Sequence, residues 1–331
     1  MPLAGWPDAS VDSLESASRG PHAAAGPRGD RIVTAPVTAA ASGTWRLGDL
    51  VVRRIGFGAM RVSQRGAAFS AGAAAGNRQL AISVLRRAVE LGVNHIDTAA
   101  FYFSALRSAN ELINSALAPY SDDLVIVTKV GPARDSSGEW RPAPGPGGLR
   151  GQVEENLRQL GRDHLDVVNL RVLRDMEPLA DYFGALAQLQ QAGLIRHLGI
   201  SGVRPDQLAE ARQIAPVVCV QNSYSLAVRD SAPVLRECGA LGIAFVPFFA
   251  IAGTGRHRGV TGPEPAGLAA IARAHNATPA QVALSWTLHQ GEHVLAIPGT
   301  GDPDHLAENV AAGAIRLSAA ELATLDALPG R

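Results

Sequence analysis

The sequence is poor in cysteine and has neither a long apolar run nor a net charge. Only two of its 331 residues are cysteines, Cys219 and Cys238, and their lack of CxxC spacing or secretory context favours a reduced, cytoplasmic compartment. The 30 basic residues balance 30 acidic ones, so nothing predicts a nucleic acid or an anionic membrane as a partner. No apolar run is long enough to span a bilayer. The histidines are scattered without ligand spacing, which predicts no metal site.

The first residues differ from the rest of the chain. Residues 1–42 are rich in Ala, Gly, Pro and Ser and show no sustained periodicity. They also lack the basic start and apolar core of a signal peptide. We therefore expect a disordered extension over 1–42, followed by one catalytic domain over 43–331.

From residue 44 onward, short β-prone runs alternate with amphipathic stretches. Residues 44–47 and 50–53 flank a Gly-Asp turn and predict a hairpin. The eight further predicted strands are 55–58, 95–98, 124–129, 166–170, 197–201, 217–221, 244–247 and 294–298. The helices predicted between them include 78–91, 149–160, 179–192, 205–214 and 232–241. This alternation is typical of a parallel sheet covered by helices.

Glycine-rich phosphate-binding turns are missing. The run 55–58 is followed by Ala59-Met60-Arg61 rather than by the GxGxxG turn that a doubly wound dinucleotide-binding sheet usually carries. The glycine-rich run 144–148 is not followed by Gly-Lys-Ser/Thr, so it is not a P-loop. Of the two parallel-sheet architectures, a closed (β/α)8 TIM barrel is therefore the prediction.

An acid, a phenol and an amine fall at or just past the ends of two neighbouring predicted strands. Asp97 lies at the end of one predicted strand, Tyr102 lies in the loop that follows it, and Lys129 ends the next strand. In a barrel of parallel strands, this end carries the chemistry. The ammonium would lower the pKa of the phenol and the carboxylate would hold the ammonium in place, which together make a proton donor. A structural Asp–Lys ion pair with a tyrosine at the rim is the alternative on spacing alone.

At these residues the chain resembles the aldo-keto reductase superfamily from about residue 44 to residue 329. The motifs, in the family's order, are Gly56-Phe57-Gly58-Ala59-Met60, Asp97-Thr98-Ala99 with Tyr102, Val127-Thr128-Lys129, Leu165-Asp166-Val167-Val168-Asn169-Leu170, Leu198-Gly199-Ile200-Ser201 and Ile297-Pro298-Gly299-Thr300 with Glu308-Asn309. The resemblance implies a (β/α)8 barrel with an N-terminal β-hairpin cap. It also implies hydride transfer between a nicotinamide cofactor and a carbonyl, with Asp97, Tyr102 and Lys129 in catalytic roles.

The fourth catalytic position departs from the usual histidine of the family, because this chain has Arg171 there. Arginine does not titrate near neutral pH, so Arg171 is expected to donate hydrogen bonds to the carbonyl oxygen or to hold an anionic substrate group. The run Val167-Val168-Asn169-Leu170-Arg171 also resembles a bacterial branch that includes pyridoxal reductases (pyridoxine 4-dehydrogenases). A structural arginine paired with a nearby carboxylate is the alternative.

The resemblance also assigns cofactor-binding positions. These are Gly58, Ala59, Met60, Ser201, Gln221, Phe245, Thr300, His305, Glu308 and Asn309, with Arg256 and Arg258 on a loop expected to close over the pyrophosphate. Ser201 and Gln221 would hold the carboxamide, and Phe245 would stack on the nicotinamide ring unless it is a core residue. The adenosine phosphate would lie at the N-terminus of the helix after the last strand.

Three glycines weaken the family pattern. Gly202 stands where the family usually has Asn, and Gly299 and Gly301 stand where it often has a cation. The resemblance implies NADP(H) as the cofactor, and because these glycines weaken that preference, NAD(H) is the alternative. The expected activity is reduction of an aldehyde or ketone, with pyridoxal or another aromatic aldehyde as the leading small-molecule substrate. A sugar or biosynthetic ketone is the alternative substrate, and a weakly catalytic cofactor-binding sensor or partner subunit is the alternative function. The sequence predicts no oligomeric state.

Overall fold

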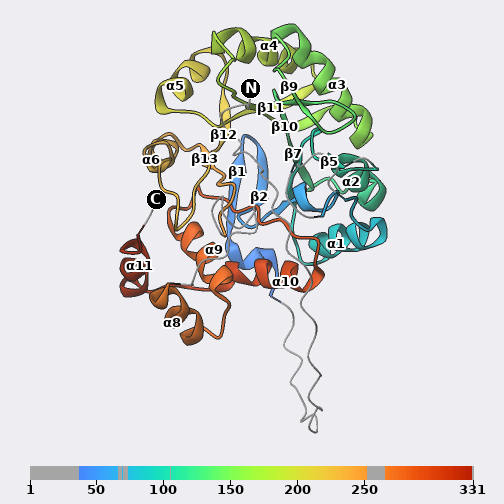
Figure 1. Ribbon diagram of the computed structural model, residues 1–331. Helices are drawn as coiled ribbons and strands as arrows, with labels where there is room; N and C mark the ends of the chain where they lie inside the picture. Colours follow the sequence, from blue (N-terminus) through green and yellow to red (C-terminus); the bar gives the residue numbers. More distant parts are fainter. Residues whose placement is uncertain (1–36, 66–68, 70–73, 105, 252–264, 330–331) are drawn as a thin grey trace.

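Seven parallel strands form one curled sheet at the centre of the protein (Figure 1). The computed structural model describes residues 37–65, 69, 74–104, 106–251 and 265–329. The strand order is β13-β12-β11-β10-β7-β4-β3. These strands are β3 (Phe57–Gly58), β4 (His95–Asp97), β7 (Val125–Val130), β10 (Leu165–Arg171), β11 (Ile195–Ser201), β12 (Val217–Gln221) and β13 (Ala244–Phe245). Each falls on a predicted strand.

The predicted eighth strand, 294–298, joins the two edges of this sheet. Val294 forms a parallel bridge with Phe245 of β13, and Ala296 forms another with Ile55, just before β3. The segment is too short and irregular to count as a strand, yet its backbone hydrogen bonds connect both edges. The sheet therefore closes, and the predicted (β/α)8 barrel is confirmed.

Helices surround the barrel (Figure 1). They are α1 (Arg78–Glu90), α2 (Ala109–Leu117), α3 (Leu149–Leu160), α4 (Leu179–Gln191), α5 (Pro205–Ile214), α6 (Ala232–Leu241), α8 (Ala266–Ala274), α9 (Pro279–His289), α10 (Pro303–Ala311) and α11 (Ala319–Asp326). Short 3-10 helices are η1 (Ala39–Ser42), η2 (Ala59–Arg61), η3 (Pro146–Gly148) and η4 (Ala312–Ala314). The helices that were predicted from amphipathic stretches, α1, α3, α4, α5 and α6, each bury an apolar face against the barrel. Among the described residues, no helix has the length and apolar character needed to cross a membrane.

The predicted hairpin, β1 (Thr44–Leu47) and β2 (Leu50–Arg53), closes the N-terminal end of the barrel. Leu47 and Val52 are fully buried against Val125 and Val167, which lie near the starts of their strands. This apolar cluster fills the N-terminal end of the barrel, and the cavity described below lies at the opposite end.

The packed part of the chain begins earlier than the predicted boundary at residue 42. Ala39 and Ser42 of η1 are buried, and the Ser42 hydroxyl accepts a hydrogen bond from the amide of Ile55 (3.0 Å). Ala39 and Ser42 thus anchor this segment to the barrel, whereas Val37, Thr38 and Ala40 are exposed. Residues 1–36, the rest of the predicted extension, lie outside the described residues.

Two short hairpins stand at the C-terminal end of the barrel, and the periodicity of the sequence did not predict them. One is β5 (Phe103–Ser104) with β6 (Arg107–Ser108), in the loop after β4. The other is β8 (Ala133–Arg134) with β9 (Trp140–Arg141), in the loop after β7. Both flank the end of the barrel where polar side chains gather.

Candidate active site

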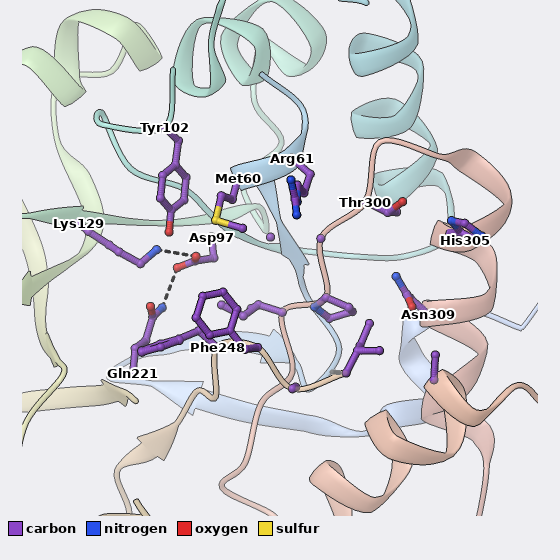
Figure 2. A pocket seen from close by; sticks show the side chains of 18 of the residues that line it. Met60, Arg61, Asp97, Tyr102, Lys129, Gln221, Phe248, Thr300, His305 and Asn309 are labelled. Atoms are coloured by element: carbon purple, nitrogen blue, oxygen red, sulfur yellow. Dashed lines mark hydrogen bonds and ion pairs between the residues drawn. The ribbon is translucent and has the colours of Figure 1, made fainter. Parts of the chain in front are cut away.

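A buried ion pair lies at the C-terminal ends of β4 and β7. Lys129 Nζ donates to Asp97 Oδ1 (2.5 Å) and to the carbonyl oxygen of Thr98 (3.0 Å). The other carboxylate oxygen, Oδ2, accepts from Nε2 of Gln221 (2.7 Å), at the end of β12 (Figure 2). Parallel strands bring these three side chains together because each stands at the same end of its strand. Among the described residues, the buried Oε1 of Gln221 has no hydrogen-bond partner.

Tyr102 lies directly beside this pair. Lys129 Nζ is 4.9 Å from the centroid of the Tyr102 ring, and the phenol points toward the pair (Figure 2). Burial raises the pKa of Tyr102, while the charges of Lys129 and Arg171 act in the opposite direction. Burial also disfavours the charge on Lys129, but Asp97 and Tyr102 together raise the pKa of Lys129 above its ordinary value. The ammonium of Lys129 lowers the pKa of Tyr102 as expected, but the opposite effect of burial is larger.

These residues line a cavity of about 530 Å³. The cavity extends from the Lys129 side to a second group of polar side chains around Thr300 and Asn309 (Figure 2). Most residues predicted for the site line it: Gly58, Met60, Asp97, Tyr102, Lys129, Arg171, Ser201, Gln221, Thr300, His305, Glu308 and Asn309. The fold thus collects side chains that are up to 251 positions apart in the chain (58 to 309) around one cavity.

Arg171, the last residue of β10, extends its guanidinium toward the end of β11. Nη1 donates to the hydroxyl of Ser201 (3.4 Å), and Cζ lies 5.2 Å from the centroid of the Phe248 ring. Burial lowers the pKa of the Arg171 guanidinium, and the charge that opposes this shift comes from Tyr102 rather than from a carboxylate. The predicted alternative, a structural pair with a carboxylate, therefore finds no support among the described residues.

Gly202 makes room for this guanidinium. Its φ is +74°, and a Cβ built on it would lie 2.1 Å from Nη1 and 2.9 Å from Cζ of Arg171. The guanidinium therefore occupies the space that a side chain at position 202 would need. Arg171 and Gly202 therefore fit together sterically, because the arginine fills the space that the glycine leaves.

A sequence model of the aldo/keto reductase family matches residues 54–329, which is most of the chain. The chain belongs to the aldo/keto reductase family. Its resemblance to that family, expected from the motifs, is confirmed.

Curated relatives support the same assignment for this aldo/keto reductase. It is 43% identical over 298 residues to pyridoxine 4-dehydrogenase of Escherichia coli (strain K12), an alignment that covers 87% of this chain and 98% of that protein. It is 38% identical to an uncharacterised oxidoreductase of Schizosaccharomyces pombe, covering 88% of this chain and 91% of that one. The predicted likeness to the pyridoxine 4-dehydrogenase branch is thus confirmed.

Solved structures share the fold. The crystal structure of an aldo-keto reductase from Klebsiella pneumoniae in complex with NADPH superposes with a TM-score of 0.72 at 29% identity. That likeness covers 86% of this chain and 94% of the Klebsiella chain. The barrel of this aldo/keto reductase therefore has the same fold as that of the Klebsiella protein, which was crystallised with NADPH.

Phe245, which was predicted to stack on the nicotinamide ring, lies away from the cavity. Phe245 is fully buried in β13 and packs edge-on against Tyr224, with ring centroids 5.9 Å apart, so it does not line the cavity. Side chains alternate along a strand, and Ala244 and Val246 are the ones that face the barrel interior. The next residue of that parity is Phe248, which does line the cavity (Figure 2).

Ala59 and the N-terminus of α10 were also predicted to contact the cofactor. Ala59 is fully buried and does not line the cavity. The N-terminus of α10 is already capped, because Asp302 Oδ1 accepts from the amides of Asp304 (2.8 Å) and His305 (3.3 Å). A phosphate there would meet a carboxylate, so the helix terminus by itself is not an anion site. Arg256 and Arg258 lie outside the described residues.

Other lining residues were not among the predicted site residues. They are Arg61, Phe101, Phe248, Phe249, Ala250, Ile251, Thr278, Pro279, Ala280, Ile297, Pro298 and Gly299. Phe248 has the same strand parity as Ala244 and Val246, but only the structure shows that this parity faces inward. Arg61 directly follows the predicted Met60. The segment 278–280 begins α9 and reaches the cavity only through tertiary packing.

Proposed function

We propose that this aldo/keto reductase uses NADP(H) to reduce an aldehyde or ketone to the alcohol, with Tyr102 as the proton donor. The observation that carries the proposal is the buried Asp97–Lys129 ion pair beside the Tyr102 phenol. A phenol with the ordinary pKa of about 10 is protonated at neutral pH, and burial raises the pKa of Tyr102 further, so a proton is available to give. Lys129, charged because Asp97 supports it, stabilises the phenolate that forms once the proton has left.

The lining of the cavity suits a nicotinamide cofactor. The buried Gln221 Oε1 is an acceptor without a partner among the described residues, and it can accept from a carboxamide N–H. Ser201, beside it on β11, offers a hydroxyl, and Phe248 offers a ring face. The polar residues Thr300, His305, Glu308 and Asn309, at the far end, would hold the adenosine part.

The chemistry then follows from the placement of the side chains. A reduced nicotinamide, when bound, supplies a hydride to the carbonyl carbon. The Tyr102 hydroxyl gives its proton to the carbonyl oxygen as negative charge grows there. Arg171 supports that oxygen, or a neighbouring anionic group, with fixed N–H donors.

The proposed substrate is pyridoxal or another aromatic aldehyde with an anionic ring oxygen. The guanidinium of Arg171 borders the cavity, and no carboxylate among the described residues forms an ion pair with it. Its planar fork matches a ring hydroxylate, and Phe248 and Phe101 provide apolar walls for an aromatic ring. The 43% identity to the E. coli protein described as pyridoxine 4-dehydrogenase supports this substrate class.

The test is Tyr102→Phe, assayed by NADPH consumption with pyridoxal and with an unsubstituted aromatic aldehyde. We expect kcat to fall by at least about a hundredfold, as for loss of a general acid, while the Kd for NADPH stays unchanged. Tyr120→Phe is the matched control, because the Tyr120 hydroxyl donates to the carbonyl of Leu160 (2.7 Å) and Tyr120 does not line the cavity. Turnover of Tyr102→Phe equal to that of the control would refute the proposal.

A further inference from the structure

The peptide groups around Tyr102 are fixed by one arginine from another loop. The carbonyl oxygen of Tyr102 itself accepts from the amide of Ala109 (2.9 Å). The carbonyls on either side, those of Phe101 and Phe103, both accept from Nη1 of Arg134, at 3.1 Å and 2.9 Å. One guanidinium nitrogen thus bridges the residues before and after the proposed proton donor.

Arg134 is itself held rigidly by its hairpin. Its Nε donates to the carbonyl oxygen of Gly138 (2.9 Å). Gly138 has a φ of +91°, and a Cβ there would lie 2.8 Å from Nη2 of Arg134, so this glycine makes room for the guanidinium. The Cζ atom of Arg134 lies 4.6 Å from the ring centroid of Phe103 and 5.5 Å from that of Trp140. Hydrogen bonds and ring contacts together fix the orientation of the fork.

We propose that Arg134 is a positioning residue for the reaction, which fixes the backbone on both sides of Tyr102 and so holds the phenol beside Lys129. The inference rests on the proposed function, in which Tyr102 is the proton donor. Arg134 does not line the cavity, so its action on the reaction passes through Tyr102. Lysine cannot replace it fully, because an ammonium lacks the planar fork and its ring contacts.

The first experiment compares Arg134→Met and Arg134→Lys with the parent protein. Displacement of a catalytic group by about 1 Å can cost about a hundredfold in rate, so we expect Arg134→Met to lower kcat about tenfold to a hundredfold. The Kd for NADPH should stay within about twofold, and Arg134→Lys should be intermediate. The alkaline limb of the pH–rate profile should move to higher pH, because Tyr102 leaves the ammonium that lowers its pKa.

Arg229→Met is the matched control. Arg229 also donates to carbonyl oxygens, those of Leu226 (3.2 Å), Leu325 (3.0 Å) and Asp326 (2.6 Å), and it lies 5.3 Å from the ring centroid of Trp286. It does not line the cavity. Its loss should lower the melting temperature without changing kcat or the pH–rate profile, which separates a general loss of packing from a loss of positioning.

The deciding experiment places Arg134→Met in the Tyr102→Phe background. If Arg134 acts through Tyr102, the double variant should be no slower than Tyr102→Phe alone. An equal further loss in that background, or unchanged kcat in Arg134→Met, would overturn the positioning role while leaving Tyr102 as donor. Full activity of Tyr102→Phe would overturn both proposals. If Arg134→Met fails to fold, the same comparisons with Arg134→Lys decide the question.

Discussion

Replacing Gly202 with alanine tests whether Arg171 needs the position that it has in this structure. The added Cβ would lie 2.1 Å from Nη1 of Arg171, whereas ordinary contacts at a Cβ begin at 3.4 Å. The guanidinium would therefore have to move by about 1.3 Å, the difference between these distances. A displacement of about 1 Å in a group that acts on the transition state costs about a hundredfold. We expect kcat/KM for pyridoxal to fall about a hundredfold.

The assay must separate this clash from backbone strain, because alanine is disfavoured at a φ of +74°. Gly193 provides the control: its φ is +79°, and nothing lies within 4 Å of a Cβ built on it. Gly193→Ala should lose similar stability and keep full activity. Steady-state kinetics and melting temperatures of both variants would be measured side by side.

A double-mutant cycle gives the refutation. In the Arg171→Ala background the clash is gone, so Gly202→Ala should add little to the loss that Arg171→Ala already causes. The reasoning fails if Gly202→Ala keeps the activity of the Gly193→Ala control. It also fails if its hundredfold loss persists in the Arg171→Ala background.

The other predictions concern charge and protonation. Lys129→Met should lower kcat by at least about a hundredfold and move the alkaline limb of the pH–rate profile upward, because Tyr102 loses the ammonium that lowers its pKa. An unshifted profile with an unchanged rate would disprove this coupling. Arg171→Lys should weaken turnover of aromatic hydroxy-aldehydes more than that of simple aromatic aldehydes, since the charge remains but the fork is lost; equal losses would leave only general support of the oxyanion. His95→Gln should reduce acid destabilisation. Burial lowers the pKa of His95 to about 4, below its ordinary 6.5, so the unfolded chain binds the proton first as the pH falls. The unfolding free energy should therefore drop between pH 6.5 and pH 4, by an amount on the order of 2–3 kcal/mol, in the parent but not in the variant. Urea unfolding at pH 7 and pH 4.5 measures the unfolding free energy of both proteins. An equal change in this free energy between the two pH values in parent and variant would contradict the prediction.

The amino-acid sequence by itself determined the barrel and the proximity of Asp97 and Lys129. The bounds of α3, α5 and α6 equal those predicted, because apolar periodicity and a turn or glycine at each end are local signals. Asp97 and Lys129 could be placed together because parallel strands in this fold bring their C-terminal ends to one edge. Their ion pair needed no knowledge of packing beyond that rule.

Tertiary structure decided which neighbours these residues have. The choice of Phe248 over Phe245 depends on which face of β13 turns inward, and a run of consecutive apolar residues does not show this. The match of Gly202 to Arg171 and the bridge from Arg134 to the carbonyls of Phe101 and Phe103 join residues about 30 positions apart. Such contacts depend on angles and distances of a few ångströms between elements, and no local pattern of residues records them. Hydrophobic periodicity could therefore specify the scaffold and the place of the Asp97–Lys129 pair, whereas the neighbours of Tyr102 and Arg171 were set by how the loops and strand ends pack.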